Sequence, residues 1–356
     1  MLTVQAPGKL FIAGEYAVVE TGMPAILVAL NRFVTVTIDA SNDYGSIISK
    51  QYQGKLIWQR EGNKMVFDNR DNPFQYILTA IQLTEEYAYQ QNAQLRLFHL
   101  RVNSQLDSAD GKKYGLGSSA AVTVATVRAV CKFYHLNVNK EIIFKLAAIA
   151  HLSVQKNGSL GDIAASVYGG WIAYHTFDKN WLKTQENKIS LSELVQMPWP
   201  SLSVQQLTPP DDLQLIIGWT GSPASTSHLI DRIEQFKQQQ IQAYQSFLKA
   251  SQVCLNQMIA GFIQHNLAII QKEIKVNRQL LQKLAQLSGV SIETPLLKKM
   301  CQSATIIKAA AKSSGAGGGD CGIVIANKNQ DIQPMLAIWK KDHIEQLPLH
   351  VYQVEG

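Results

Sequence analysis

The chain has 356 residues, more than the about 100–200 of a typical domain, which favours two lobes or domains that share a cleft. Its composition, 46% hydrophobic and 17% charged, excludes an intrinsically disordered chain. The net charge of +6 comes from scattered lysines and arginines without a basic stripe. We therefore expect a small anionic ligand and predict binding to neither nucleic acid nor membranes.

The cysteines are far apart, with no C-x-x-C pair and no histidine at ligand spacing, so we predict neither a disulfide framework nor a zinc site. They are Cys131, Cys254, Cys301 and Cys321. The first residues lack a signal-peptide pattern, and no uncharged stretch reaches the roughly 18–20 residues that span a bilayer. We expect a cytoplasmic protein that is neither secreted nor membrane-spanning.

The first third of the chain is predicted to be rich in strands. The N-terminus reads APGKLFIAGEYAVV, which places Lys9 between a Pro-Gly turn and an apolar, strand-like run. Residues 33–38 (FVTVTI) and 95–102 (LRLFHLRV) are typical of strands. Taken alone, Lys9 is more often a solvated surface lysine than a catalytic one, so both interpretations stay open at this point.

The segment KKYGLGSSAAVTVA places Gly115 and Gly117 directly before a predicted buried helix, for which Ser118 and Ser119 offer an N-cap. Glycines allow a close backbone approach, and free N–H groups at a helix start attract phosphate. A dinucleotide fingerprint would follow a strand directly, and a Walker loop needs Gly-Lys-Ser/Thr; neither condition is met. A phosphate loop is therefore favoured over a glycine-rich turn without a ligand, and Ser119 could offer its hydroxyl to Mg²⁺.

A second helix is predicted over residues 140–154, followed by GSLGDIAASVYGG. Asp162 in this segment is either a carboxylate held at a cleft or a helix N-cap, and the local pattern leaves the two interpretations balanced. Residues 177–212 are polar and contain prolines, which predicts the connection between two lobes. Helical spacing of apolar residues dominates after this connection.

Near the C-terminus, Thr294 and Pro295 predict the start of a helix that leads to Lys312. The glycine run in AKSSGAGGGDCG follows, and then CGIVIA and PLHVYQV predict strands. Four glycines in five positions imply positive φ angles or a close approach, because glycine loses the most backbone freedom on folding. A helix end with a tight turn would explain only one or two of them.

These segments, in their order and spacing, resemble the GHMP kinase superfamily across nearly the whole chain. GEYAV, KYGLGSSAA, GSLGDIAASVYGG and SGAGGGDCG look like its phosphomevalonate kinase branch. The resemblance implies an α+β, two-lobed fold with the active site in the cleft. Residues 1–180 would form the N-terminal ATP-binding lobe and residues 181–356 a ferredoxin-like C-terminal lobe, with an approximate boundary within 177–212.

The resemblance also implies the cofactors ATP and Mg²⁺ and a set of site residues. Lys9 and Asp162 would be catalytic, and Ser119 would face the metal. The ATP-binding residues would be Lys113, Gly115, Leu116, Gly117, Ser118, Ser119 and Ala120. The acceptor-binding residues would be Tyr16, Gly158, Ser159, Ser222, Ser225, Gly317, Gly318 and Gly319. Two departures from the family pattern are a missing proline upstream of the first glycines and His151 where mevalonate kinases often have a metal-binding glutamate.

The expected reaction is ATP-dependent phosphorylation of 5-phosphomevalonate to 5-diphosphomevalonate in the mevalonate route to isoprenoids. Lysines near the first glycine loop favour this anionic acceptor over an alcohol such as mevalonate or homoserine. A decarboxylase on the same scaffold and a non-catalytic ligand-binding relative also stay open, although intact Lys9, Asp162 and glycine loops argue against the latter. The sequence leaves a monomer and a homodimer equally open.

Overall fold

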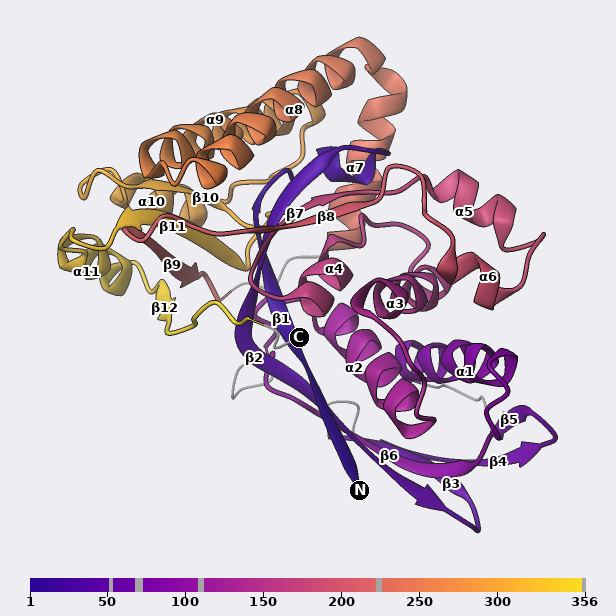
Figure 1. Ribbon diagram of the computed structural model, residues 1–356. Coiled ribbons are helices and arrows are strands. Elements are labelled where there is room, and N and C mark those ends of the chain that lie inside the picture. The colour runs from indigo at the N-terminus through magenta and orange to yellow at the C-terminus, as the bar shows by residue number, and fades with distance from the viewer. Residues whose placement is uncertain (51–53, 68–72, 108–111, 222–225, 354–356) are drawn as a thin grey trace.

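The computed structural model describes residues 1–50, 54–67, 73–107, 112–221 and 226–353 (Figure 1). The chain forms two β-sheets with helices packed on them, in a mixed α/β arrangement of two lobes. This is the two-lobed α+β fold that the family resemblance implies.

The N-terminal sheet has the strand order β5-β4-β3-β6-β2-β7-β8, with β1 paired to β2. Its strands are β1 (Leu2–Ala13), β2 (Pro24–Ser41), β3 (Gly45–Ser49), β4 (Gly54–Glu61), β5 (Lys64–Phe67), β6 (Leu97–Ser104), β7 (Trp171–His175) and β8 (Ser203–Leu207). The accompanying helices are η1 (Ala17–Val19), α1 (Gln75–Gln90), α2 (Ser118–Phe133), α3 (Lys140–Val154), α4 (Gly161–Tyr168), α5 (Lys179–Gln185) and α6 (Leu191–Gln196).

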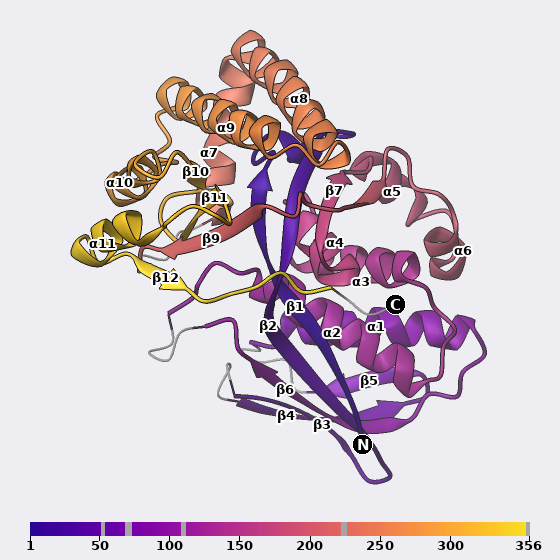
Figure 2. The same cartoon turned by 60° about the vertical axis from the view of Figure 1, so that its left-hand side comes forward.

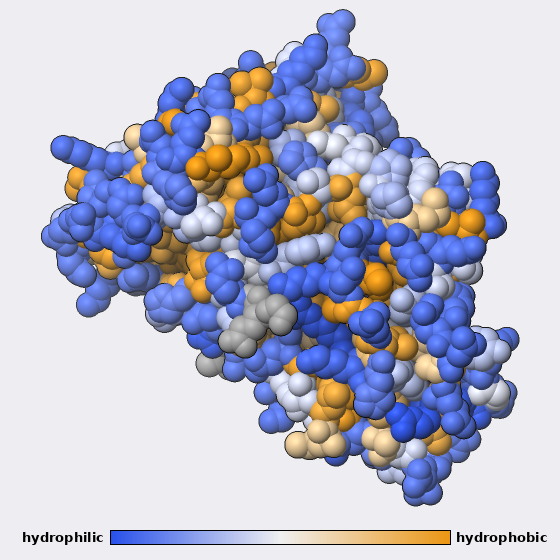
Figure 3. All heavy atoms as spheres, in the orientation of Figure 1, coloured by the Kyte–Doolittle hydropathy of each residue, from blue (hydrophilic) through white to orange (hydrophobic). Residues whose placement is uncertain are grey.

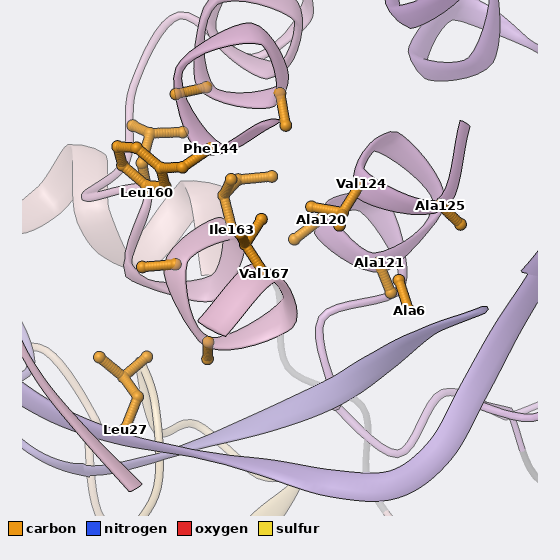
Figure 4. Close-up of a cluster of buried hydrophobic side chains, with 14 of the residues drawn as sticks. Ala6, Leu27, Ala120, Ala121, Val124, Ala125, Phe144, Leu160, Ile163 and Val167 are labelled. Atoms are coloured by element: carbon orange, nitrogen blue, oxygen red, sulfur yellow. The ribbon is translucent and has the colours of Figure 1, made fainter. Parts of the chain in front are cut away.

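Helices α2 and α4 pack on β1 and β2, and α1 and α3 pack against α2. Figure 4 shows this core, in which Ala121 of α2 lies beside Ala6 of β1. Ile163 of α4 points toward α3 and α2 in the same view. Small residues on α2 let its backbone approach the sheet closely, so the predicted buried helix is confirmed.

The second sheet has the strand order β10-β11-β9-β12, with every pair antiparallel. In chain order, one strand, a group of helices, two strands, one helix and a last strand form the split βαββαβ arrangement of ferredoxin-like folds. The elements are β9 (Leu213–Trp219), α7 (Thr226–Gln239), α8 (Ile241–Ile263), α9 (Leu267–Ser288), α10 (Pro295–Ser303), β10 (Ala310–Ser313), β11 (Cys321–Asn327), α11 (Gln333–Lys341) and β12 (Glu345–Leu347).

The chain passes from the first sheet to the second between Leu207 and Leu213, because β8 still pairs with β7. Elements α5 and α6 precede this crossing and lie beside the N-terminal lobe (Figure 1). We therefore propose a lobe boundary near residue 210 instead of residue 180. The C-terminal segment then returns to the first lobe, where the Tyr352 N–H donates to the Ala29 carbonyl at 2.9 Å (Figure 2).

Several local predictions are confirmed: residues 33–38 lie in β2, CGIVIA lies in β11, and the helix over 140–154 is α3. Residues 97–102 of the second predicted strand lie in β6. The Pro7-Gly8 turn is wrong, since both residues stay within β1, at a register shift opposite β2. The helix leading to Lys312 is also wrong, because α10 ends at Ser303 and Lys312 lies in strand β10.

Two further local predictions are corrected. The chain turns after α10 at Lys308, which has a φ of +54°, so the glycine run follows a strand instead of a helix. In PLHVYQV, only a single bridge from Val351 to Leu30 is present among the described residues. The segment adds this bridge and backbone hydrogen bonds with Ala29, Asn31 and Gly170 of the first lobe instead of a new strand.

No helix in the described part of the chain is both long and apolar enough to cross a membrane. Hydrophilic residues cover most of the face seen in Figure 3, with apolar side chains in scattered groups. All four cysteines are buried and unpaired.

Candidate active site

A cavity of about 400 Å³ brings together segments that are far apart in the chain. Its wall comes from β1, η1, the first turns of α2 and α4, the end of α3, Tyr76 of α1, Ile230 of α7 and the loop after β10. The predicted site residues on this wall are Lys9, Tyr16, Lys113, Gly115, Leu116, Gly117, Ser118, Ser119, Gly158, Ser159 and Asp162. Ser222 and Ser225 lie outside the described residues.

Lys9 lies in the interior of β1 and is 9% exposed, so it is not a solvated surface lysine. Its backbone N–H donates to the Leu116 carbonyl at 2.9 Å, and its Nζ donates to the Gly115 carbonyl at 3.2 Å. The aliphatic part of the side chain runs past Gly117, where an added Cβ would come within 2.9 Å of Lys9 Cε. The ammonium group is therefore fixed against the first glycine loop.

The first glycine loop, residues 115–117, turns through two left-handed positions, with φ of +77° at Gly115 and +79° at Gly117. Gly117 is the N-cap of α2, and no side chain of the described residues caps the helix. The predicted serine N-cap is therefore wrong, and the first-turn N–H groups of α2 remain available to an anion. Ala120 is fully buried in the core and does not line the cavity.

Asp162 lies in the first turn of α4, where Leu160, with a φ of +63°, is the N-cap. The N-cap interpretation of Asp162 is therefore wrong, although its Oδ1 accepts a hydrogen bond from the Ile163 N–H at 3.0 Å. The loop before α4 is held by Tyr174, whose hydroxyl donates to the Ser159 carbonyl at 2.7 Å. A supported loop and a helix start thus hold one carboxylate at the cavity wall.

The second glycine loop, residues 315–319, contributes less to the cavity than predicted. Ser314, Gly315, Ala316, Asp320 and Cys321 line the cavity, whereas Gly317, Gly318 and Gly319 do not. The Gly318 N–H donates to the Ile292 carbonyl at 2.8 Å, and a Cβ on Gly317 would lie 2.1 Å from the same oxygen. The close approach that these glycines permit is thus to the backbone before α10.

The two glycine loops meet beside Lys9. A Cβ added to Gly115 would approach Oδ2 of Asp320 within 2.7 Å. The buried Cys321 thiol donates to the Tyr114 carbonyl at 3.1 Å, which ties the end of the second loop to the residue before the first. Motifs about 200 residues apart in the sequence therefore form one wall.

A buried ion pair next to the cavity was not predicted. Lys312 Nζ, 0% exposed, contacts Oε1 of Glu15, which is 2% exposed. The same oxygen accepts from the Gly315 N–H at 3.3 Å, and the Tyr16 hydroxyl donates to the Ala316 carbonyl. Burial, followed by the Glu15 charge, raises the pKa of Tyr16 and keeps this donor protonated. The signal available in the sequence was a single charged residue of opposite sign in each of two largely apolar segments, Glu15 in one and Lys312 in the other.

A cluster of three side chains from α1, α2 and α3 forms another part of the wall. His151, 3% exposed, places Nε2 3.3 Å from Ser119 Oγ, and its ring lies 5.0 Å from that of Tyr76. Burial lowers the pKa of His151, and the opposing effect of Asp162 is smaller. Burial, then Asp162, raises the pKa of Tyr76. Sequence reasoning noticed His151 but gave no role to Tyr76, Gln155 or Asn157, which also line the cavity.

The charges on the cavity wall do not show the predicted surplus of cations. Among the described lining residues there are two lysines and three carboxylates: Lys9, Lys113, Glu15, Asp162 and Asp320. Lys312 compensates Glu15 from behind the wall. Charge near the loop therefore does not by itself select an anionic acceptor.

Comparison with known proteins matches both lobes of this chain to one family. Residues 75–170 match the family described as "GHMP kinases N terminal domain", and residues 258–345 match "GHMP kinases C terminal". A phosphomevalonate kinase of Streptomyces sp. (strain CL190) is 36% identical over 97% of this chain and 95% of its own length. A mevalonate kinase of Pyrococcus horikoshii is 27% identical over 91% of this chain and 88% of its own length.

A solved structure of Streptococcus pneumoniae phosphomevalonate kinase in complex with phosphomevalonate and AMPPNP superposes with a TM-score of 0.87. It is 30% identical, and the match covers 99% of this chain and 100% of that one. The bound AMPPNP is an analogue of ATP. The chain therefore belongs to the GHMP kinases, a family of ATP-dependent phosphotransferases.

Proposed function

We propose that this protein transfers the γ-phosphoryl group of ATP to the phosphate of 5-phosphomevalonate, forming 5-diphosphomevalonate in the mevalonate route to isoprenoids. The observation that carries the proposal is a single cavity in which Lys9, the first glycine loop and Asp162 meet. The similarity to two phosphomevalonate kinases, at 36% and 30% identity over nearly the whole chain, supports this choice of acceptor.

The first glycine loop and the uncapped start of α2 would hold the triphosphate of ATP, with Lys113 beside them. Mg²⁺ fits this wall through Ser119, which lines the cavity and carries a hydroxyl oxygen; the described residues contain no group of three or more His, Cys, Asp or Glu that could hold a metal. Such a sparse site suits Mg²⁺, which keeps several waters and needs few protein ligands. When bound, the ion would neutralise charge on the phosphate oxygens.

The acceptor needs little help from a base. A phosphate monoester has a second pKa of about 6 and is largely a dianion at neutral pH, so its attacking oxygen is already deprotonated. Asp162 would then orient the acceptor and Lys9, while the Lys9 ammonium stabilises charge on the phosphates as they approach each other. With an alcohol acceptor, Asp162 would have to remove a proton instead.

This division of roles predicts unequal effects of two substitutions. Lys9→Met should lower kcat by about 10²–10³-fold, because one preorganised electrostatic contact is lost. Asp162→Asn should lower kcat by only about tenfold, since a general base would contribute roughly 10²–10⁴-fold. Steady-state kinetics with saturating ATP measure both values. Equal losses would mean that Asp162 acts as a base and that the proposed roles are wrong.

The acceptor is tested by ADP release from Mg-ATP with phosphomevalonate, mevalonate and homoserine in separate reactions. We expect the highest kcat/KM with phosphomevalonate. Faster turnover of mevalonate or homoserine would identify an alcohol kinase, and ATP binding without turnover of any acceptor would identify a ligand-binding relative. Stoichiometric release of CO₂ would identify a decarboxylase.

A further inference from the structure

The contact between His151 and Ser119 joins the end of α3 to the first turn of α2, at the cavity wall. The Ser119 backbone is fixed independently, because its carbonyl accepts a hydrogen bond from the Thr123 hydroxyl at 2.8 Å. The remaining freedom of Ser119 is the rotation of its side chain, and the neighbours of its hydroxyl are His151 and Tyr76. The direction of the hydroxyl therefore depends on these two residues.

The surroundings of His151 favour one tautomer of its ring. The Nδ1 atom is buried and has no hydrogen-bond partner within the described part of the structure, whereas Nε2 faces Ser119 Oγ. A neutral imidazole carries one donor and one acceptor nitrogen. Buried donors without a partner are rarer than buried acceptors without one, so the proton belongs on Nε2. His151 then donates to Ser119 Oγ, which directs the serine proton away from His151, toward the Tyr76 oxygen or an acceptor bound in the cavity.

We propose that His151 is a positioning residue, which donates a hydrogen bond from Nε2 to Ser119 and thereby directs the Ser119 hydroxyl toward the phosphates of the bound nucleotide. The Ser119 proton can then reach a phosphate oxygen, and a lone pair of Oγ stays open to the cavity. This inference rests on the proposed kinase function, in which Ser119 faces the nucleotide. In this role His151 acts through Ser119.

Two substitutions at His151 separate this role from simple packing. The amide nitrogen of glutamine can reach the position of Nε2 and donate to Ser119, whereas the shorter asparagine reaches only the position of Nδ1. His151→Asn should weaken Mg-AMPPNP binding, measured by calorimetry without acceptor, by about tenfold, the size of one hydrogen bond. His151→Gln should stay within about threefold of the unsubstituted protein. Both variants should keep a cooperative unfolding transition.

A double-mutant cycle with Ser119→Ala completes the test, because it isolates the interaction between the two side chains. In the Ser119→Ala background, His151→Asn should have no further effect on Mg-AMPPNP affinity. An undiminished loss in that background, or a glutamine variant as weak as the asparagine variant, would overturn the proposal. Nucleotide affinity does not depend on the acceptor, so an intact cycle in a protein that turns over none of the three acceptors would refute only the proposed function.

Discussion

The two glycine loops of the molecule adopt similar backbone conformations for different reasons. Gly117 in the first loop and Gly315 and Gly317 in the second have φ angles of +79°, +75° and +75°. In the first loop, the space next to the glycine hydrogens is taken by Lys9 and Asp320, both of which line the cavity. In the second, the space at Gly317 is taken by the Ile292 carbonyl, which belongs to the scaffold. Glycines thus make room for cavity residues in the first loop, whereas Gly317 of the second loop makes room for the scaffold.

The largest effect is expected at Lys312, which anchors the start of the second loop. Lys312→Met leaves the buried Glu15 carboxylate uncompensated and should lower the free energy of unfolding by about 3–5 kcal/mol. Denaturant unfolding measures this loss. Adding Glu15→Gln to this variant removes the buried charge and should restore more than half of the lost free energy of unfolding. A single variant that loses under about 1 kcal/mol would show that the pair does not anchor the loop.

The next largest effect is expected from a comparison of alanine substitutions at two glycines of the second loop. Gly317→Ala should lower the free energy of unfolding by about 3 kcal/mol, because the left-handed conformation and the contact with the Ile292 carbonyl both cost stability. Gly315→Ala is the matched control: its φ is the same, and its Cβ would meet no atom of the described residues within 4 Å. It should lose only about 1 kcal/mol. Equal losses would mean that packing against Ile292 is unimportant.

The smallest effect is expected in the first loop. In Gly117→Ala, the new Cβ would come within 2.9 Å of Lys9 Cε, in a side chain that can shift. The unfolding free energy should fall by only about 1 kcal/mol, as for Gly315→Ala, because the φ angles are similar. Displacing Lys9 should nevertheless lower kcat by about tenfold. A large loss of stability with unchanged kcat would assign this loop to the scaffold as well.

Local sequence determined the elements whose signals lie within a few residues. Asn139 caps α3 by accepting from the Ile142 N–H at 2.9 Å, and Thr294 caps α10 by accepting from the Leu297 N–H at 3.3 Å. Apolar spacing and β-branched runs placed α2, α3, β2 and β11 correctly. The end of α10 was missed, because it depends on pairing of the following residues with β11 and not on a local breaker. The order of the motifs was enough to identify the family.

Glycines, a lysine and a carboxylate suited to phosphate chemistry could all be located in the chain before its fold was known. The folded chain was needed to show that Lys9 is buried against Gly115, 106 positions away, and that Gly317 faces Ile292 instead of the cavity. It also paired Glu15 with Lys312, which are 297 positions apart. Helix caps and turns depend on hydrogen bonds between residues that are close in the chain, so local sequence predicts them. Contacts between distant residues form only after two sheets have closed around one cavity, so local sequence does not predict them.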